Sequence, residues 1–297
     1  MREENRLRES DLPTRISLWR KIVNRLMYIL LIVALLLAVI PLIYILADVV
    51  IRGAPAISIE FLTHLPTGPT LSGGGIANTI AGTFTMVGMA ALISVPIGVG
   101  AGIFFSEWPT SKLSTVSGFM NDVLTGFPSM VIGLFVFIIV VLNTKYFSAF
   151  AGAVALSIIM IPIIARTTDE SLRLVPTTLR EASMALGVPR WKTIFRVVVS
   201  TGKTGLMTGV VLAIARAAGE TAPLLLTAAT SSHYITNLFT QPTGSMTVLI
   251  YQYGTSPYKS WQTQAWGAAL VLILIMLALN LFVKLVIGRN LTEARME

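Results

Sequence analysis

Six long apolar stretches restrict this 297-residue chain to a membrane-embedded fold. About 20 mostly apolar residues are needed to cross the hydrocarbon core of a bilayer. Hydrophobic residues make up 54% of the sequence and charged residues only 12%. The alternating pattern of barrel strands is absent, so we expect helices, which satisfy their own backbone hydrogen bonds in lipid. The sequence therefore predicts an all-α integral membrane protein with six transmembrane helices. These predicted spans are Leu26–Val50, Ile76–Phe105, Ser117–Leu142, Phe147–Ala165, Gly205–Ala229 and Ala265–Ile287.

The distribution of positive charge predicts the orientation of these spans. If the N-terminus is cytoplasmic, all but four of the 22 Lys and Arg residues lie on the cytoplasmic side, the exceptions being Arg52, Lys145, Arg216 and Lys259. The positive-inside rule predicts this asymmetry. It accounts for the net charge of +8 without a nucleic-acid partner. We expect a multi-pass protein of the cell (inner) membrane with both termini in the cytoplasm.

Three regions follow from these spans: a basic N-terminal segment (1–25), a six-helix transmembrane domain (26–287) with a cytoplasmic loop (166–203), and a tail (288–297). The first span is too long for the apolar core of a secretory signal and no cleavage pattern follows it, so we expect a retained anchor. Cysteine is absent, which excludes thiolate catalysis and thiolate metal sites. The two histidines fall in separate loops, so no metal site is expected.

The cytoplasmic loop is predicted to form two short helices separated by a tight break. Thr178 and Glu181 have capping-box spacing, Gly187 is suited to end the first helix, and Pro189 to begin the second. An apolar stripe at helical spacing marks the second helix as amphipathic. Its members are Trp191, Ile194, Phe195 and Val198. Three interpretations fit this pattern: a DNA-binding helix-turn-helix, an interfacial loop, and a docking element for a partner. A DNA-binding unit held between two membrane spans would have little room to reach a groove of DNA.

Two opposite charges interrupt the fifth predicted span. Arg216 lies near its centre and Glu220 one helical turn later. Charged residues at this depth usually face a bundle interior or a solute path. Pro223 has no N–H and crowds the carbonyl group of Gly219, so the helix is expected to bend beside both charges. The arrangement indicates either a polar solute path or a structural ion pair between packed helices.

The third predicted span carries a weaker version of the same pattern. Gly126, Pro128 and Ser129 interrupt the helix, and Asp122 lies near its cytoplasmic end. Broken helices are tolerated at membrane depth where they line a cavity. A gate or cavity lining is one interpretation, and a proline kink filled by a neighbouring span is the other.

Two groups of residues resemble a known family. Glu181-Ala182-Ser183, followed by Gly187, is similar to the EAA loop of ATP-binding-cassette (ABC) importer permeases. Residues 216–228, Arg-Ala-Ala-Gly-Glu-Thr-Ala-Pro-Leu-Leu-Leu-Thr-Ala, are similar to the signature of the PstA family of phosphate-importer permeases. The likeness covers roughly residues 76–287. The chain departs from the EAA pattern at its end, where Val197, Val199 and Ser200 replace the Ile, Leu and Pro of an Ile-x-Leu-Pro sequence. Because this proline is missing, a sharp turn into the fifth span has less support.

The resemblance implies a type I ABC importer permease fold with a cytoplasmic coupling helix. It places Glu181, Ala182, Gly187 and Arg190 at the contact with a partner ATPase. It also implies the partners: a homologous PstC-like permease, two copies of a PstB-like ATPase, a PstS-like phosphate-binding protein, and membrane lipid, with no nucleic acid. Residues 202–204 copy the end of a nucleotide-binding loop, but valine occupies the position of its first glycine. We therefore expect no cofactor on this chain, and ATP and Mg on the partner ATPase.

The function predicted by these features is the import of inorganic phosphate by a subunit that is not itself an enzyme. We predict a substrate pathway of Arg216, Glu220, Thr221 and Ser129, and a helix break or gate at Pro223, Gly219 and Pro128. A guanidinium group suits phosphate because its planar donors match two oxygens and it keeps its charge. Another oxyanion, such as phosphonate, molybdate or sulfate, is the alternative cargo. A membrane-embedded enzyme would need a nucleophile, a metal cluster or a second carboxylate near Glu220, and none is evident.

Overall fold

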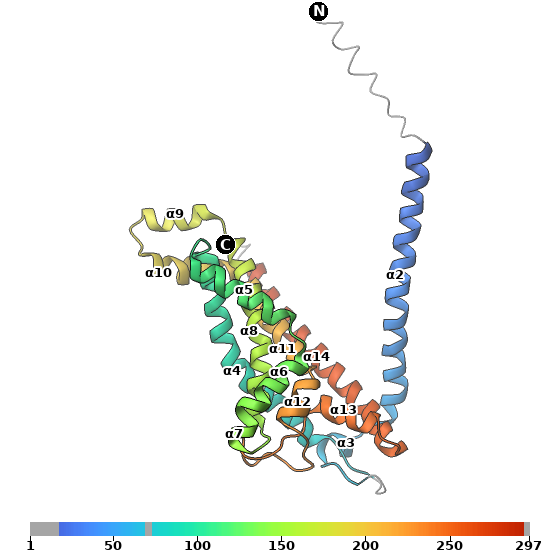
Figure 1. The fold of residues 1–297 in the computed structure, drawn as a ribbon. Coiled ribbons are helices and arrows are strands. Elements are labelled where there is room, and N and C mark those ends of the chain that lie inside the picture. The colour runs from blue at the N-terminus through green and yellow to red at the C-terminus, as the bar shows by residue number, and fades with distance from the viewer. Residues whose placement is uncertain (1–17, 69–72, 294–297) are drawn as a thin grey trace, which may run out of the picture. The chain divides into compact units, whose positions relative to one another are not determined.

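The computed structural model describes residues 18–68 and 73–293, and every regular element in these residues is helical (Figure 1). One short element, η1, is a 3-10 helix, and two, η2 and η3, are π-helical turns inside longer helices. In chain order the elements are α2 (Leu18–Gly53), η1 (Ala54–Ala56), α3 (Ile59–Thr63), α4 (Ala77–Glu107), α5 (Lys112–Gly126), α6 (Ser129–Val136), η2 (Phe137–Val141), α7 (Leu142–Thr144), α8 (Ala149–Arg173), α9 (Thr177–Ala185), α10 (Arg190–Thr193), η3 (Ile194–Val198), α11 (Val199–Ala218), α12 (Ala222–Thr227), α13 (Met246–Gly254) and α14 (Lys259–Glu293).

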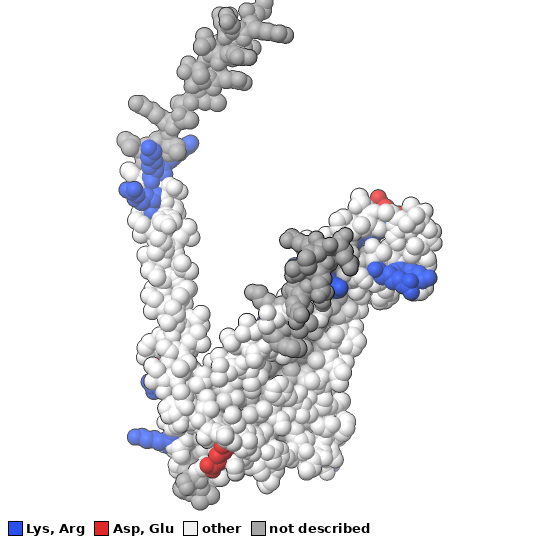
Figure 2. All heavy atoms as spheres, turned by 180° about the vertical axis from the view of Figure 1, so that it is seen from behind, with Lys and Arg blue, Asp and Glu red and all other residues white. Residues whose placement is uncertain are grey.

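Within the described residues, five helices are long and apolar enough to cross a membrane, and a bent pair gives a sixth candidate. The prediction of an all-α membrane fold is therefore confirmed. On the face drawn in Figure 2, the charged side chains of the second unit lie toward its ends and the surface between them is white, as expected for a band that faces lipid. The five single helices are Trp19–Ala56, Ala77–Glu107, Ala149–Arg173, Arg190–Ala218 and Lys259–Leu281.

The chain divides into two compact units, Met1–Ile51 and Arg52–Glu297. The described part of the first unit is the helix α2, whose most apolar window has a mean hydropathy of 3.2 and which contains Pro41. This helix begins at Leu18, earlier than the predicted start at Leu26. Most of the predicted N-terminal segment, residues 1–17, and the last residues of the tail, 294–297, lie outside the described residues.

The second unit is built around α8, which has 67% of its apolar window buried, whereas α4 has 28%. Glycines let α4 approach it: a Cβ added at Gly98 would lie 2.8 Å from the Cβ of Ile164, and one at Gly102 would lie 2.5 Å from the Cβ of Thr168. The small-residue face of the second span therefore serves close helix packing. The buried core around α8 includes Met86, Ala90, Leu156, Met160, Ile164, Ala213, Ala217, Leu224 and Val248.

One helix, α13, lies inside the segment 230–264 that the sequence presents as an outer loop. Ser245 begins it, because its side-chain oxygen accepts a hydrogen bond from the N–H group of Val248 at 3.3 Å. Tyr253 stacks on Trp261 with ring centroids 4.4 Å apart. These aromatic residues therefore pack against each other, in addition to any role as membrane anchors. The cluster around them includes Phe61, Ile76, Met246, Leu249, Ala265, Ala268 and Val271.

The third predicted span, Ser117–Leu142, is broken into two helices, as its predicted interruption requires. Its two parts, Lys112–Gly126 and Ser129–Thr144, are bent by 104° relative to each other. Phe127 adopts an extended backbone conformation, φ −70° and ψ 136°, as expected for the residue before a proline. The interruption itself lies where the sequence predicts it, at Pro128 and Ser129.

The fifth predicted span, Gly205–Ala229, has the wrong limits. The helix runs without a break from Arg190 to Ala218, so the second helix of the predicted cytoplasmic loop is the beginning of this span. Ser200 stands where the EAA pattern has proline, and the helix continues through it after a π-helical turn at Ile194–Val198. The capping box is also wrong, because Pro176 precedes the helix α9 and no side chain caps it.

Candidate functional site

The site lies at a break between two helices of the second unit. The helix α11 ends at Ala218 and α12 begins at Ala222. The last turn tightens, since the N–H group of Gly219 bonds the carbonyl oxygen of Arg216 at 3.0 Å. Pro223 occupies the first turn of α12, where its missing N–H group leaves no hydrogen bond unmade. The break thus frees backbone groups within one turn of both charges.

Arg216 and Glu220 form a loose pair at this break. The Nε atom of Arg216 lies 3.6 Å from the Oε1 atom of Glu220, which is longer than a hydrogen bond. The Arg216 side chain is 57% exposed and that of Glu220 is 16% exposed. The Arg216 side chain is therefore mostly open, whereas the Glu220 side chain is largely covered by protein. Arg216 can therefore bind an anion, and the Glu220 carboxylate is close enough to compete with that anion for the guanidinium group.

Thr247, which the sequence analysis does not single out, supports the break from α13. Its Oγ1 atom donates a hydrogen bond of 2.8 Å to the backbone carbonyl oxygen of Glu220, and Thr247 is only 5% exposed. A carbonyl group at a helix break needs such a partner, because the intrahelical donor is missing. The bond joins residues 27 positions apart, a separation that no local pattern reveals.

Replacing Thr247 with valine is expected to destabilise the break. Valine keeps the shape of threonine but leaves the partly buried carbonyl group of Glu220 without this partner, which costs up to about 1–3 kcal/mol. The measurement is the thermal unfolding midpoint of the purified complex, together with its transport rate. Thr255→Val is the matched control, because Thr255 lies at the end of the same helix and its hydroxyl group bonds the exposed carbonyl oxygen of Tyr251. Equal midpoints for the two variants would contradict the prediction.

The two interrupted spans meet at α6 and α12. A Cβ added at Gly133 would lie 2.6 Å from the Cα atom of Pro223, so the two backbones are in direct contact. Ser129 lies one helical turn before Gly133, at the start of α6, and is partly buried. The structure thus brings the predicted gate residues Pro128 and Pro223 onto two helices that pack together.

Asp122 links the other half of the bent pair to α8. Its Oδ1 atom accepts a hydrogen bond of 3.2 Å from the Nη1 atom of Arg166, and Arg166 also donates to Glu170 at 2.6 Å. All three side chains are more than half exposed, so the pairs contribute little to stability. Asp122 is therefore a surface tether between α5 and α8 rather than part of the break.

The loop between α8 and α11 extends from the helical body as α9 and α10 (Figure 1). Gly187 ends the first helix with a left-handed backbone, φ 77°, which confirms its predicted conformation. Glu181 and Ala182 are exposed on α9. Arg190 is also exposed, but it contacts the end of α4: its Nη2 atom donates to the carbonyl oxygen of Glu107 at 2.7 Å, and its guanidinium group lies 4.9 Å from the ring centroid of Trp108. A partner can therefore reach the exposed residues of α9, and the start of the following helix is partly exposed as well.

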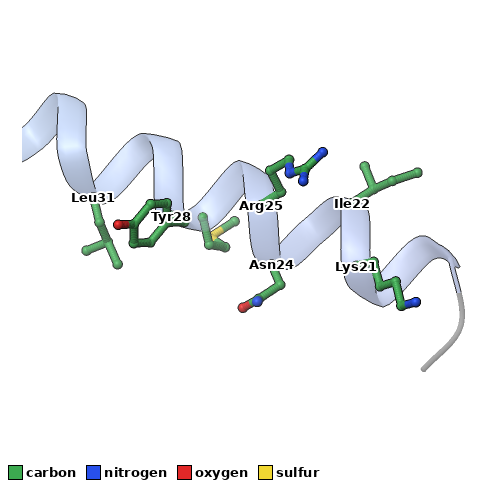
Figure 3. A pocket seen from close by; sticks show the side chains of 7 residues that line it. Lys21, Ile22, Asn24, Arg25, Tyr28 and Leu31 are labelled. Atoms are coloured by element: carbon green, nitrogen blue, oxygen red, sulfur yellow. The ribbon is translucent and has the colours of Figure 1, made fainter. Parts of the chain in front are cut away.

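A hollow of about 660 Å³ lies on the first unit, along the beginning of α2 (Figure 3). All of its lining residues come from this single helix, so it cannot enclose a solute. Lysine, arginine and tyrosine at a helix end typically lie at the headgroup level of a membrane. The lining residues are Lys21, Ile22, Asn24, Arg25, Met27, Tyr28 and Leu31.

Comparison with solved structures defines the class of this fold. A chain of the MetNI methionine ABC transporter in an inward-facing conformation superposes with a TM-score of 0.60, covering 71% of this chain and 95% of that chain at 17% identity. A second crystal form of that transporter gives a TM-score of 0.56. Residues 94–290 also match the family described as binding-protein-dependent transport system inner membrane component. The protein is an inner membrane permease subunit of an ABC importer, a class that works with permease and ATPase subunits and is not itself an enzyme.

Sequence relatives define the family within this class. The phosphate transport system permease protein PstA of Yersinia pestis is 39% identical over 273 residues, which are 92% of each chain. PstA of Xylella fastidiosa (strain Temecula1) is 44% identical over 80% of this chain and 83% of its own length. PstA 1 of Mycobacterium tuberculosis (strain H37Rv) is 38% identical over 90% and 88%, respectively. The chain belongs to the PstA family of permeases.

Proposed function

We propose that this chain is the transmembrane subunit of an ATP-driven inorganic phosphate importer and forms half of its translocation pathway. The observation that carries the proposal is a half-exposed guanidinium group at a helix break, in a chain whose relatives are named as phosphate transport permeases. A PstC-like permease would supply the other half. Two PstB-like ATPases would bind ATP and Mg and hydrolyse the nucleotide, and a PstS-like protein would deliver phosphate. Both termini would then be cytoplasmic.

Arg216 is proposed to contact phosphate as it passes the break. Guanidinium donors match two phosphate oxygens at once, and the group does not deprotonate in a partly dry site. Glu220 would compete for the same guanidinium group from 3.6 Å away. Such competition suits transport, because a site that holds its solute too tightly would trap it. Ser129 and Thr221 are proposed to complete the pathway on either side of the contact between α6 and α12.

ATP-driven motion is proposed to reach this site through alternating access. ATPase closure would move α9 and α10, and the unbroken helix from Arg190 to Ala218 ends beside the charged pair. Gly219, Pro223 and Pro128 would then open or close the pathway at the two breaks. Glu181, Ala182, Gly187 and Arg190 would form or support the surface that meets the ATPase.

Uptake of labelled phosphate into membrane vesicles tests this function. The vesicles contain the chain with its permease, ATPase and binding-protein partners, and ATP is supplied on the ATPase side. We expect ATP-dependent accumulation of phosphate that unlabelled phosphate inhibits and unlabelled sulfate or molybdate does not. Accumulation of sulfate or molybdate without phosphate would refute the proposed cargo.

Glu220→Gln is expected to weaken discrimination against sulfate. Near neutral pH phosphate carries a proton that can be donated to a carboxylate group, whereas sulfate has none, so we propose that Glu220 selects the protonated anion. The measurement is the ratio of phosphate to sulfate uptake, which should fall by roughly tenfold, the equivalent of about one charge-assisted hydrogen bond. Glu60→Gln, a change at an exposed glutamate, serves as the control. An unchanged ratio with intact uptake would remove this role from Glu220.

A further inference from the structure

Arg180 directs all three parts of its guanidinium group into the protein. Its Nε atom donates to the Oε1 atom of Glu107 at 3.0 Å, at the end of α4. Its Nη1 atom donates to the carbonyl oxygen of Val175 at 2.6 Å, and its Nη2 atom to that of Leu172 at 2.9 Å, at the end of α8. The side chains of Arg180 and Glu107 are 17% and 6% exposed. One side chain of α9 therefore joins the ends of two spanning helices.

Apolar packing does not explain how α9 is held. Among its residues, Thr177 to Ala185, none is buried, so the helix has no core of its own. The ion pair between Arg180 and Glu107, by contrast, is largely covered by protein. Such a pair has a defined geometry, because the fork of donors fixes the carboxylate and both carbonyl groups at once.

A second tie reaches the same end of α4 from the other side of the loop. Arg190, at the start of α10, bonds the backbone carbonyl oxygen of Glu107 and covers the ring of Trp108. The hydroxyl groups of Ser183 and Thr193 lie 2.9 Å apart and connect α9 with the beginning of the fifth span. The C-terminal end of α4 is therefore held from both halves of the loop.

We propose that Arg180 and Glu107 form the joint through which the ATPase-facing loop moves α4, so that these two residues couple ATP hydrolysis to transport without touching the solute. The alternating-access mechanism proposed above carries motion from the loop only along the continuous helix Arg190–Ala218. The joint adds a second route, because α4 packs along the central helix α8. Both residues are positioning residues, and their role rests on the proposed function, because it requires an ATPase that pushes on α9.

The test measures phosphate uptake and ATP hydrolysis in the same vesicles. For Arg180→Gln and for Glu107→Gln we expect phosphate moved per ATP hydrolysed to fall by about tenfold, with assembly and hydrolysis retained, and the double variant to be no worse than either single one. Arg196→Gln is the matched control, because Arg196 is an exposed arginine of the same segment. Unchanged coupling in an assembled Arg180→Gln complex, or additive losses in the double variant, would overturn the proposal.

A second measurement needs no solute and keeps the test independent of the cargo. The chain contains no cysteine, so spin labels can be attached at two introduced cysteines, Leu186→Cys after α9 and Leu92→Cys on α4, which replace side chains that are 84% and 79% exposed. With Arg180 present, we expect the distribution of distances between the labels to stay narrow and unchanged when ATP is added, because α9 and α4 move together. With Arg180→Gln, ATP should broaden or shift it.

The two proposals fail separately in these experiments. A wild-type complex that hydrolyses ATP but moves no phosphate would refute the proposed cargo, and the label distances would still report on the joint. Identical distances in wild type and Arg180→Gln, with ATP bound in both, would overturn the joint whatever the cargo. If Arg180→Gln does not assemble, Glu107→Gln, which keeps an oxygen acceptor of the same shape, carries both measurements.

Discussion

Arg216→Gln should abolish phosphate uptake, with a loss of roughly a hundredfold or more, in a complex that still assembles. Removing one member of a charge-assisted contact with a partly desolvated phosphate costs several kcal/mol. Stability should change little, because Arg216 is 57% exposed and its contact with Glu220 is only a 3.6 Å ion pair. The measurement is ATP-dependent phosphate uptake at matched amounts of assembled complex.

A conservative variant separates the charge of Arg216 from its shape. Arg216→Lys keeps the positive charge but loses the planar fork, so it should recover only part of the uptake. Arg196→Gln removes an exposed arginine from an earlier turn of the same continuous helix and should transport normally. Normal uptake by Arg216→Gln would make the Arg216–Glu220 contact purely structural and would move the pathway elsewhere.

The geometry of this contact bears on the two interpretations that the sequence leaves open. A structural ion pair between packed helices would be covered on both sides and well aligned, because a buried charge without a good partner is costly. Here the arginine is mostly exposed and both residues border the same helix break. Ion pairs with an exposed member contribute little, and exposed pairs are worth about 0–1 kcal/mol. The structural interpretation therefore explains little of why a charged residue occurs in this span.

Local chemistry explains which parts of the fold the sequence predicts. The spans depend on length and hydropathy, and the breaks depend on proline and glycine, which act within one turn. The left-handed backbone at residue 187 favours glycine for a local steric reason, which does not depend on distant contacts. At the entry to the fifth span the EAA pattern lacks its proline, so the sequence gives little support for a turn there. The helix in fact continues from Arg190 to Ala218.

Contacts between distant residues are the part that the sequence could not supply. Arg180 and Glu107 are 73 positions apart, and either residue alone looks like an ordinary charge at the end of a helix. Thr247 lies on α13, a helix of nine residues that is too short to be recognised by periodicity. These residues hold the loop and the break in place, but their partners become visible only when the helices are packed.

Gly133→Val should disrupt the contact between the two interrupted spans and lose most transport. The added Cβ would lie 2.6 Å from the Cα atom of Pro223 and 3.2 Å from its carbonyl oxygen, so backbone must move to accept it. Overpacking of this kind costs about 1–3 kcal/mol, and more where the neighbour is backbone. Because Pro223 lies in the first turn of the helix that follows the charged pair, the displacement should reach the break itself. The measurements are the thermal unfolding midpoint of the complex and its phosphate uptake.

Gly118→Val provides the matched control for this prediction. Gly118 lies within the neighbouring helix α5, and no heavy atom lies within 4 Å of a Cβ added there. Valine and glycine have similarly low helix propensities, so this variant should retain its unfolding midpoint and its uptake. If Gly133→Val behaves like Gly118→Val, the close approach of α6 and α12 is not needed for transport, and the gate must depend on α11 alone. A loss confined to Gly133→Val would place both broken helices in the same moving unit.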